Sequence, residues 1–145
     1  MANVRTYDPS KVIISVGGVP MSGYTDGTFC EVVRNEATWN LVVGADGNST
    51  RSKTNNFSGT LTITLKQSSP SNDVLSSFLA LDELSNAGIV PVLIKDLSGN
   101  SIYFSAQGWV QGYANSTFAK DITDRTWTIQ LATLDAFVGS NAETV

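Results

Sequence analysis

Residues 44–66 read GADGNSTRSKTNNFSGTLTITLK, and they join a long polar segment to the most regular strand pattern in the chain. Between Thr60 and Leu65, threonine alternates with leucine and isoleucine, the period of two that a strand shows when one face of its sheet is buried. The fourteen residues of segment 44–57 follow neither the strand period nor the helical one. A structureless loop of about 12–15 residues is uncommon in a compact domain unless it is functional or disordered. We therefore look for function first in this segment.

Apolar runs separated by turn residues predict further short strands on both sides of this stretch. The predicted strands are 12–16, 28–34, 39–43, 58–66, 89–94, 101–106, 109–118 and 125–134. We expect 28–34, 39–43 and 58–66 to be consecutive neighbours in one antiparallel sheet, because sequential strands commonly pair. Within strand 89–94, Pro91 must lie at an edge or a bulge, since proline cannot donate to a ladder. The residues DLSGN at 96–100 predict a hairpin turn.

One segment, about residues 70–87, has the wide apolar stripe of an amphipathic helix. Ser69 is the predicted N-cap, Pro70 the first helical residue, and Gly88 the residue that ends the helix. The predicted fold is therefore mainly β, an antiparallel two-sheet sandwich or barrel with one flanking α-helix. We expect a single domain over 1–145, with an extended N-terminal arm of about residues 1–10 and a loose C-terminal tail of about 138–145.

Composition excludes several classes of function. Nine Lys and Arg against 13 Asp and Glu give a net charge of −4, which argues against tight nucleic-acid binding. The chain has no histidine and a single cysteine, Cys30, so it lacks the groups for a histidine-based triad or a thiolate zinc site. Asp46, Asn48 and Thr50 have the spacing that opens a calcium loop, but Arg51 stands where that loop needs glycine. We expect no enzymatic activity, no cofactor and no metal.

The first residues, MANVRTYDPSKVIISVGG, contain no apolar core of the kind found in secretory leaders, and no run approaches the roughly 18 apolar residues of a membrane span. The sequence therefore predicts a soluble protein without a membrane anchor, made in the cytoplasm.

Three stretches of the chain carry a resemblance to a known family: VVGADGNSTRSKTNNFSGTLTITLKQSSPSNDVLSSFLALD, GIVPVLIKDLSGN and TWTIQLATLDAFVGSN. They occur in the same order in the tail tube proteins of contractile-tailed bacteriophages, which the chain resembles over roughly residues 12–141. The resemblance implies a structural protein whose hexameric rings stack into a hollow tube in the virion tail. DNA passes through such a tube into the host cell. The implied partners are further copies of the chain, the tail sheath, and baseplate and tail-terminator proteins.

The tube reading gives the polar strand faces and the long loop specific roles. A channel through which DNA slides suits uncharged polar groups with few cations. The lumen-facing candidates, from strands 28–34, 39–43, 58–66 and 125–134, are Glu31, Asn40, Thr60, Thr62, Thr64, Thr126, Thr128 and Gln130. The predicted contact loop between stacked rings carries Asp46, Asn48, Arg51, Lys53, Asn55 and Asn56. Its cations would meet acidic groups of a neighbour, such as Asp26, Asp82 or Glu83.

Simpler readings stay open for each of these features. Threonine on an outer strand face also follows from β propensity, and Arg51 and Lys53 also suit a solvated surface loop. The three tryptophans, Trp39, Trp109 and Trp127, favour core positions over a sugar-binding platform. The alternative functions are the tube of a phage-derived contractile injection particle that carries no DNA, and a monomeric carbohydrate-binding β-sandwich.

Overall fold

The computed structural model describes residues 4–143, and within them the fold is mainly β with one α-helix, as predicted. The α-helix is α1 (Ser71–Ser85), and a short 3-10 helix spans Pro9–Lys11. The strands are β1 (Val12–Val16), β2 (Val19–Pro20), β3 (Cys30–Arg34), β4 (Trp39–Val43), β5 (Ser49–Lys53), β6 (Gly59–Lys66), β7 (Val90–Asp96), β8 (Ile102–Val110), β9 (Asp124–Leu131) and β10 (Asp135–Phe137).

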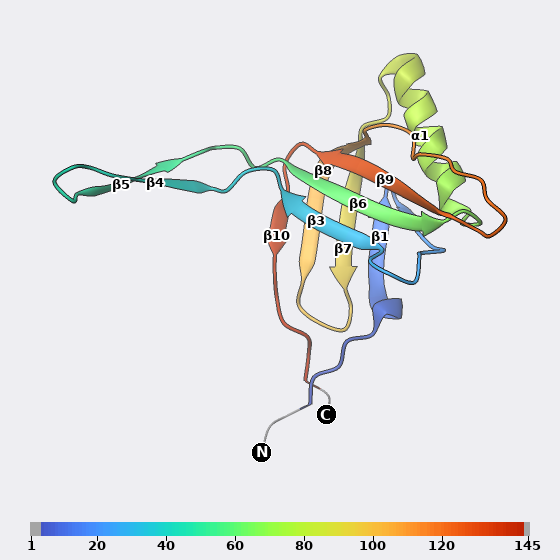
Figure 1. Ribbon diagram of the computed structural model, residues 1–145, viewed down its shortest axis with the longest axis horizontal. Helices are drawn as coiled ribbons and strands as arrows, with labels where there is room; N and C mark the ends of the chain where they lie inside the picture. Colours follow the sequence, from blue (N-terminus) through green and yellow to red (C-terminus); the bar gives the residue numbers. More distant parts are fainter. Residues whose placement is uncertain (1–3, 144–145) are drawn as a thin grey trace.

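Most strands belong to one antiparallel sheet in the order β2-β1-β7-β8-β9-β6-β3, with β10 beside β8. The long strand β8 joins two halves of this sheet, because residues near Phe104 pair with β7 and β10 while Trp109 and Val110 pair with β9. The two halves form two layers, with β3, β6 and β9 running across β1, β7 and β8 (Figure 1). The predicted two-sheet arrangement is thus a single sheet that folds over on itself.

The core lies between the two layers. The alternation that predicted the strand after the polar loop is confirmed, since Leu61, Ile63 and Leu65 are each fully buried. Their cross-strand partners in β9 are buried as well, and the opposite layer contributes Ile14, Val16, Val92 and Ile94. Burying an aliphatic side chain of this size contributes roughly 1.5–3 kcal/mol, so these alternating residues are what fixes the strand register.

Helix α1 packs on the layered sheet through Leu75 and Leu79 (Figure 1). It also accepts a hydrogen bond from the core, 2.9 Å from Trp127 Nε1 to Asn72 Oδ1. The turn between β1 and β2 lies against the helix at Gly17, whose φ is +61° and where a Cβ would come within 2.7 Å of the Phe78 ring. Glycine is therefore required there for both conformation and space.

The start of α1 differs from the prediction by one residue and its end by two. Pro70 occupies the N-cap with helical backbone angles and the helix begins at Ser71, although Ser69 Oγ still accepts a hydrogen bond from Ser71 N at 3.2 Å. The helix ends at Ser85, because Asn86 adopts the left-handed conformation, with φ +57°. Asparagine tolerates that conformation, so the helix stops before Gly88.

The expectation that 28–34, 39–43 and 58–66 are neighbours in one sheet is wrong. β3 pairs directly with β6, from Cys30 opposite Ile63 to Arg34 opposite Gly59. β4 instead pairs with β5 in a two-stranded sheet of its own. The polar segment 44–57, which looked structureless, contains the five-residue strand β5, and the pair β4-β5 is an insertion between two neighbouring strands.

Other differences lie in the second half of the chain. The predicted strands 101–106 and 109–118 are one strand, β8, which ends at Val110 and is followed by irregular chain as far as Thr123. The short strand β10 was not predicted. The placement of Pro91 is confirmed, because the β7-β8 register shifts between Val90 and Val92, the irregularity that a proline needs inside a sheet.

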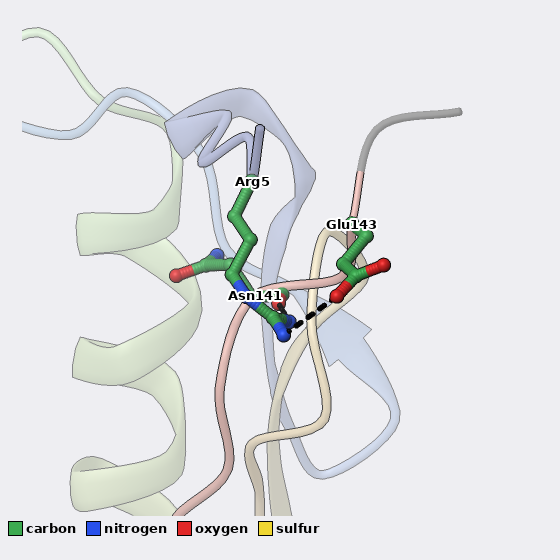
Figure 2. A network of polar contacts seen from close by, with 3 residues as sticks. All are labelled: Arg5, Asn141 and Glu143. Carbon is green, nitrogen blue, oxygen red and sulfur yellow. Dashed lines mark hydrogen bonds and ion pairs between the residues drawn. The ribbon is translucent and has the colours of Figure 1, made fainter. Parts of the chain in front are cut away.

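The two ends of the described chain pair with each other. Arg5 and Glu143 form an antiparallel bridge, and the Arg5 guanidinium reaches both Glu143 Oε1, at 3.0 Å, and the carbonyl oxygen of Asn141, at 2.7 Å (Figure 2). The chain just before Asn141 is also held against the body, because Asn100 N donates a hydrogen bond to Ser140 O at 2.9 Å. Residues predicted as terminal arm and tail, where they are described, therefore run side by side.

Candidate assembly surfaces

The most unusual feature is the β4-β5 hairpin, hereafter the arm (residues 39–53), which projects from the layered body (Figure 1). Its tip is a tight turn in which Gly44 N donates to Asn48 O at 2.8 Å, and Asp46 Oδ1 accepts from Asn48 N at 3.1 Å. Its base is closed by a hydrogen bond of 2.9 Å from Thr54 N to Thr38 O. The arm is thus an ordered two-stranded ribbon and not a loop.

One face of the arm combines apolar and cationic side chains. The register places Trp39 opposite Lys53 and Leu41 opposite Arg51, so these four side chains share a face with Val43. Trp39, Leu41 and Val43 are 45, 68 and 58% exposed. The expectation that Trp39 lies in the core is therefore wrong, because within the described chain no second layer covers this ribbon.

Two cation-π contacts order the basic groups of this face. The Arg51 guanidinium lies over the Trp39 ring at 3.9 Å, and Lys53 Nζ lies 5.3 Å from the centroid of Phe57. Each such contact contributes about 0.5–1 kcal/mol at an exposed site. The two cations therefore have preferred positions although neither forms an ion pair within residues 4–143.

The residues predicted for the contact loop are spread along the arm and its base. Asp46 and Asn48 form the tip turn, Arg51 and Lys53 lie on β5, and Asn55 and Asn56 follow the base. Asn55 has a φ of +55°, and its neighbour Asn56 donates to Glu36 Oε2 at 3.0 Å. These contacts direct the chain from the arm back into β6.

The second surface is the polar face of β3, β6 and β9. Seven of the eight lumen candidates lie together there in cross-strand rows, which are Glu31-Thr62-Thr128, Thr60-Gln130 and Thr64-Thr126. The eighth, Asn40, is on the arm and is not part of this face. Hydrogen bonds join several of these side chains to one another, such as Thr60 Oγ1 to Gln130 Oε1 at 3.4 Å. The face is thus mostly a strip of hydroxyl and amide groups, interrupted by the exposed Val33 opposite Thr60.

Few charges interrupt this strip. Glu31 lies near its middle, while Lys66 and Asp124 stand opposite each other at one end of the β6-β9 pair. A strip with one cation and two carboxylates offers little to hold phosphate groups.

A third surface is the free edge of β3, which pairs with β6 on one side and has no strand on the other within the described chain. Asn35 N donates to Ser58 O and Thr64 N to Phe29 O, each at 3.0 Å. Because bonded residues alternate along an antiparallel pair, the N–H groups of Cys30, Val32 and Arg34 point to the free edge. Soluble monomers usually protect such an edge.

Sequence reasoning missed a fourth surface, the outer face of the β1-β7-β8-β10 layer. Ile13, Lys95, Ile102 and Phe137 form one cross-strand row, and the three apolar members are 38, 38 and 61% exposed. Phe104, on the same face, is 40% exposed. The signal was present in the runs VLI and IYF, which place apolar residues on both strand faces and so indicate a strand covered on both sides.

Two titratable side chains in the interior of the described chain, Cys30 and Tyr24, have raised pKa values. Burial raises the pKa of the Cys30 thiol to about 12, so it stays protonated and unreactive at neutral pH. Burial, with a smaller contribution from Cys30, likewise raises the pKa of Tyr24 to about 12. In residues 4–143, metal-ligating side chains nowhere gather in threes, and α1 is too short and polar to cross a bilayer.

The three tryptophans do not form a shared platform. Trp39 is on the arm, Trp127 is buried in the core, and Trp109 lies on the polar side of the β8-β9 pair, opposite Gln130. A flat sugar-binding surface needs aromatic rings exposed side by side, so the geometry does not favour carbohydrate binding.

Comparison with known proteins finds a phage tail tube family and a phage structural protein. The family model described as "Bacteriophage PhiTE tail tube protein" matches residues 1–139. A curated relative, "Structural protein ORF10" of Pseudomonas phage KPP10, is 31% identical over 144 residues, which covers 94% of this chain and 83% of the relative.

Solved structures share the fold at low sequence identity. The sheath/tube terminator of the extracellular contractile injection system PVC, in its extended state, superposes with a TM-score of 0.66 at 12% identity, covering 94% of this chain and 100% of that one. The tube-terminating cap of the anti-feeding prophage gives 0.63 at 8%, covering 98 and 95%. A chain of the PVC sheath-tube complex gives 0.60 at 12%, covering 91% of each.

Proposed function

The chain belongs to the bacteriophage PhiTE tail tube protein family, and from this membership we propose that it is the repeating subunit of a hollow tail tube built from stacked hexameric rings. A member of this family is a structural component of the phage virion and not an enzyme. The observation that carries the proposal is the arm, a two-stranded hairpin with exposed apolar and cationic side chains. An isolated hairpin of this kind is only marginally stable. Because no layer of the described chain covers the arm, we expect another molecule to cover its apolar face.

Ring closure uses sheet edges. The free edge of β3 presents three N–H groups, and pairing them with an edge of the next copy continues the sheet around a ring. A head-to-tail contact of this kind produces a ring when the rotation between copies closes. The same edge that would make a monomer prone to aggregation is then consumed by assembly.

The polar strip of β3, β6 and β9 faces the lumen in this arrangement. Its threonine and glutamine side chains satisfy hydrogen bonds among themselves and with water, and its charges are sparse. Such a wall lets DNA pass without phosphate contacts that would hold it, because non-specific DNA affinity comes from cations. The outer face with Ile13, Ile102 and Phe137 is left for protein partners.

The partners follow from a tube in a contractile tail. They are further copies of the chain, the surrounding sheath, and the baseplate and terminator proteins at the two ends, with DNA in passage and no membrane anchor. Synthesis takes place in the host cytoplasm before assembly into the virion tail. The arm joins one ring to the next.

Replacing the arm tests the proposal. Thr54 N already bonds Thr38 O across the base, so a two-residue Asn-Gly turn joining Thr38 to Thr54 removes residues 39–53 without opening the body. We expect the purified wild-type chain to form tubes by negative-stain microscopy, and the armless chain to stay folded by circular dichroism and to form single rings. Wild-type protein that remains monomeric at high concentration contradicts the tube, and armless protein that forms long tubes contradicts the role of the arm.

The fold neighbours favour one second candidate, the tube of a contractile injection particle that carries no DNA. The two candidates differ in their contents. Particles purified with this subunit from a producing host would contain packaged DNA in a connected head in the first case, and sheathed tubes without DNA in the second, which nuclease treatment and gel analysis distinguish.

A further inference from the structure

The C-terminal part of α1 carries an exposed surface that is apolar and acidic. Leu81, Leu84 and Ile89 are 45, 85 and 54% exposed, and Glu83 lies among them in the sequence. Leu81 and Leu84, three residues apart, share a face of the helix, while Glu83 lies beside Leu84 around the helix and Ile89 follows the end of α1. Hereafter this end of the helix, with Leu81, Glu83, Leu84 and Ile89, is the helix patch. Large apolar side chains gathered at one exposed site mark an interaction surface more often than scattered ones do.

The electrostatics around the helix patch are uncompensated. The segment 67–94 contains three acidic residues, Asp73, Asp82 and Glu83, and no lysine or arginine. The last turn of α1 has no basic residue, although the C-terminal end of a helix carries partial negative charge that favours a nearby cation. Within residues 4–143, neither Asp82 nor Glu83 makes an ion pair. A cationic partner would therefore find an unopposed negative field here.

The arm offers a surface with the complementary chemistry. Its exposed face carries Leu41 and Val43 beside Arg51 and Lys53, and the face has no carboxylate. We propose that the apolar and cationic face of the arm of one copy docks on the helix patch of a copy in the adjacent ring. The apolar side chains of the two surfaces cover one another, while Arg51 and Lys53 approach Glu83 and the carboxyl-terminal end of α1.

The arm face and the helix patch lie far enough apart on the subunit for the same contact to repeat from copy to copy in a stack. The arm and α1 lie on opposite sides of the layered body, the arm at the left of the view and α1 at the upper right (Figure 1). A contact between surfaces on opposite sides is head-to-tail, so it leaves an unused arm and an unused helix patch at the ends of any assembly and adds copies indefinitely. Each exposed charge pair is weak, but a ring presents the contact once per subunit, and linked contacts reinforce one another. This inference rests on the proposed tube.

A charge exchange tests the docking directly. Arg51→Glu and Glu83→Arg are each expected to abolish long tubes while single rings persist, because each places like charges across the contact. The double variant Arg51→Glu with Glu83→Arg restores the attraction and is expected to restore tubes. Lys120→Glu, an exposed charge reversal outside both surfaces, is the matched control and keeps wild-type tube length. Thermal unfolding of each variant, followed by circular dichroism, verifies that the subunit is folded.

Cross-linking supplies a second measurement that does not depend on tube length. A chain with Leu41→Cys and Leu84→Cys is expected to give a disulfide-linked ladder well beyond the dimer on mild oxidation, whereas each single variant stops at dimer or monomer. Cys30 does not interfere, because burial raises the pKa of its thiol to about 12.

The outcomes separate this inference from the proposed function. If the wild type forms tubes, any one of three results would overturn the docking and leave the tube proposal intact. These are normal tubes from Glu83→Arg, a double variant that forms no more tubes than Arg51→Glu, and the absence of a disulfide-linked ladder. Wild-type protein that never forms rings would overturn both. Rescue by the double variant together with a ladder supports the docking, since an arm that binds elsewhere would not respond to position 83.

Discussion

The Arg51 guanidinium lies 3.9 Å from the centroid of the Trp39 ring, across the diagonal of a two-stranded ribbon that projects from the body. This contact joins β4 to β5 by side chains as well as by backbone. An isolated hairpin is marginally stable in water, so the stacked pair helps to keep the arm in a defined shape before it meets a partner. The Arg51 guanidinium is therefore held in a preferred position on the exposed face of the arm.

Trp39→Ala should separate folding from assembly. The arm does not belong to the main sheet, so we expect the free energy of unfolding of the body to change by less than about 0.5 kcal/mol. The arm loses its stacked pair and a large part of its apolar face, and tube formation falls sharply. Urea unfolding and negative-stain microscopy of the same preparation measure the two effects, with Trp109→Phe as the matched tryptophan control. A large loss of stability would show that the arm supports the body.

Val32→Pro should block ring closure. The N–H of Val32 points to the free edge of β3, so proline there removes a donor from a neighbour's strand while the bonds to β6 remain. We expect a folded monomer by analytical ultracentrifugation where the wild type forms rings. Val32→Ala, which keeps the N–H, serves as the control and should still close. If the proline variant still forms rings, ring closure must use a different edge of the sheet.

Thr128→Lys should make the tube retain DNA. Thr128 is central in the polar strip, and six copies in a ring would add a cationic belt. Tubes of the variant, assembled in the presence of a short oligonucleotide, should protect it from nuclease at low salt and release it as salt rises. Thr133→Lys, an exposed position beyond β9, is the control for a charge elsewhere. Equal protection by both variants would count against a lumen lined by β9.

Alkaline pH should destabilise the subunit. The pKa of Cys30 rises from 9.0 to about 12 and that of Tyr24 from 10.0 to about 12, so the folded state keeps protons that the unfolded state releases. Stability is then constant below about pH 9 and falls between pH 9 and 12, by at most about 1.4 kcal/mol per pH unit for each group. Urea unfolding at stepped pH measures this slope, and Cys30→Ala should reduce it. An unchanged slope would mean that Cys30 is solvated in the native state.

Strands with one buried face could be predicted from the sequence because their chemistry is periodic. Leu61, Ile63 and Leu65 mark β6, and Trp127, Ile129 and Leu131 mark β9, each with polar residues between. The helix was predicted for the same reason. These two strands, the other apolar runs and the helix are enough to predict a mainly β fold with a flanking helix.

The arm could not be predicted in this way. β5 reads STRSK and is exposed on both faces, so nothing alternates, and its existence depends on backbone pairing with β4. The apolar residues of β4 then suggest a buried strand, although within residues 4–143 nothing covers them. Pairing across the insertion, β3 with β6, was likewise hidden because the arm lies between them in sequence.

The bridge between Arg5 and Glu143 has a further consequence for the order of the chain. Because the described ends lie next to each other, a short peptide linking them and a new opening at the Asp46-Gly47 turn would give a circular permutant that keeps every strand pairing of the body. Such a permutant carries its new termini on the end of the arm. The strand pairing of the body therefore does not depend on where the polypeptide begins and ends. The turn at the end of the arm is the best position for new termini.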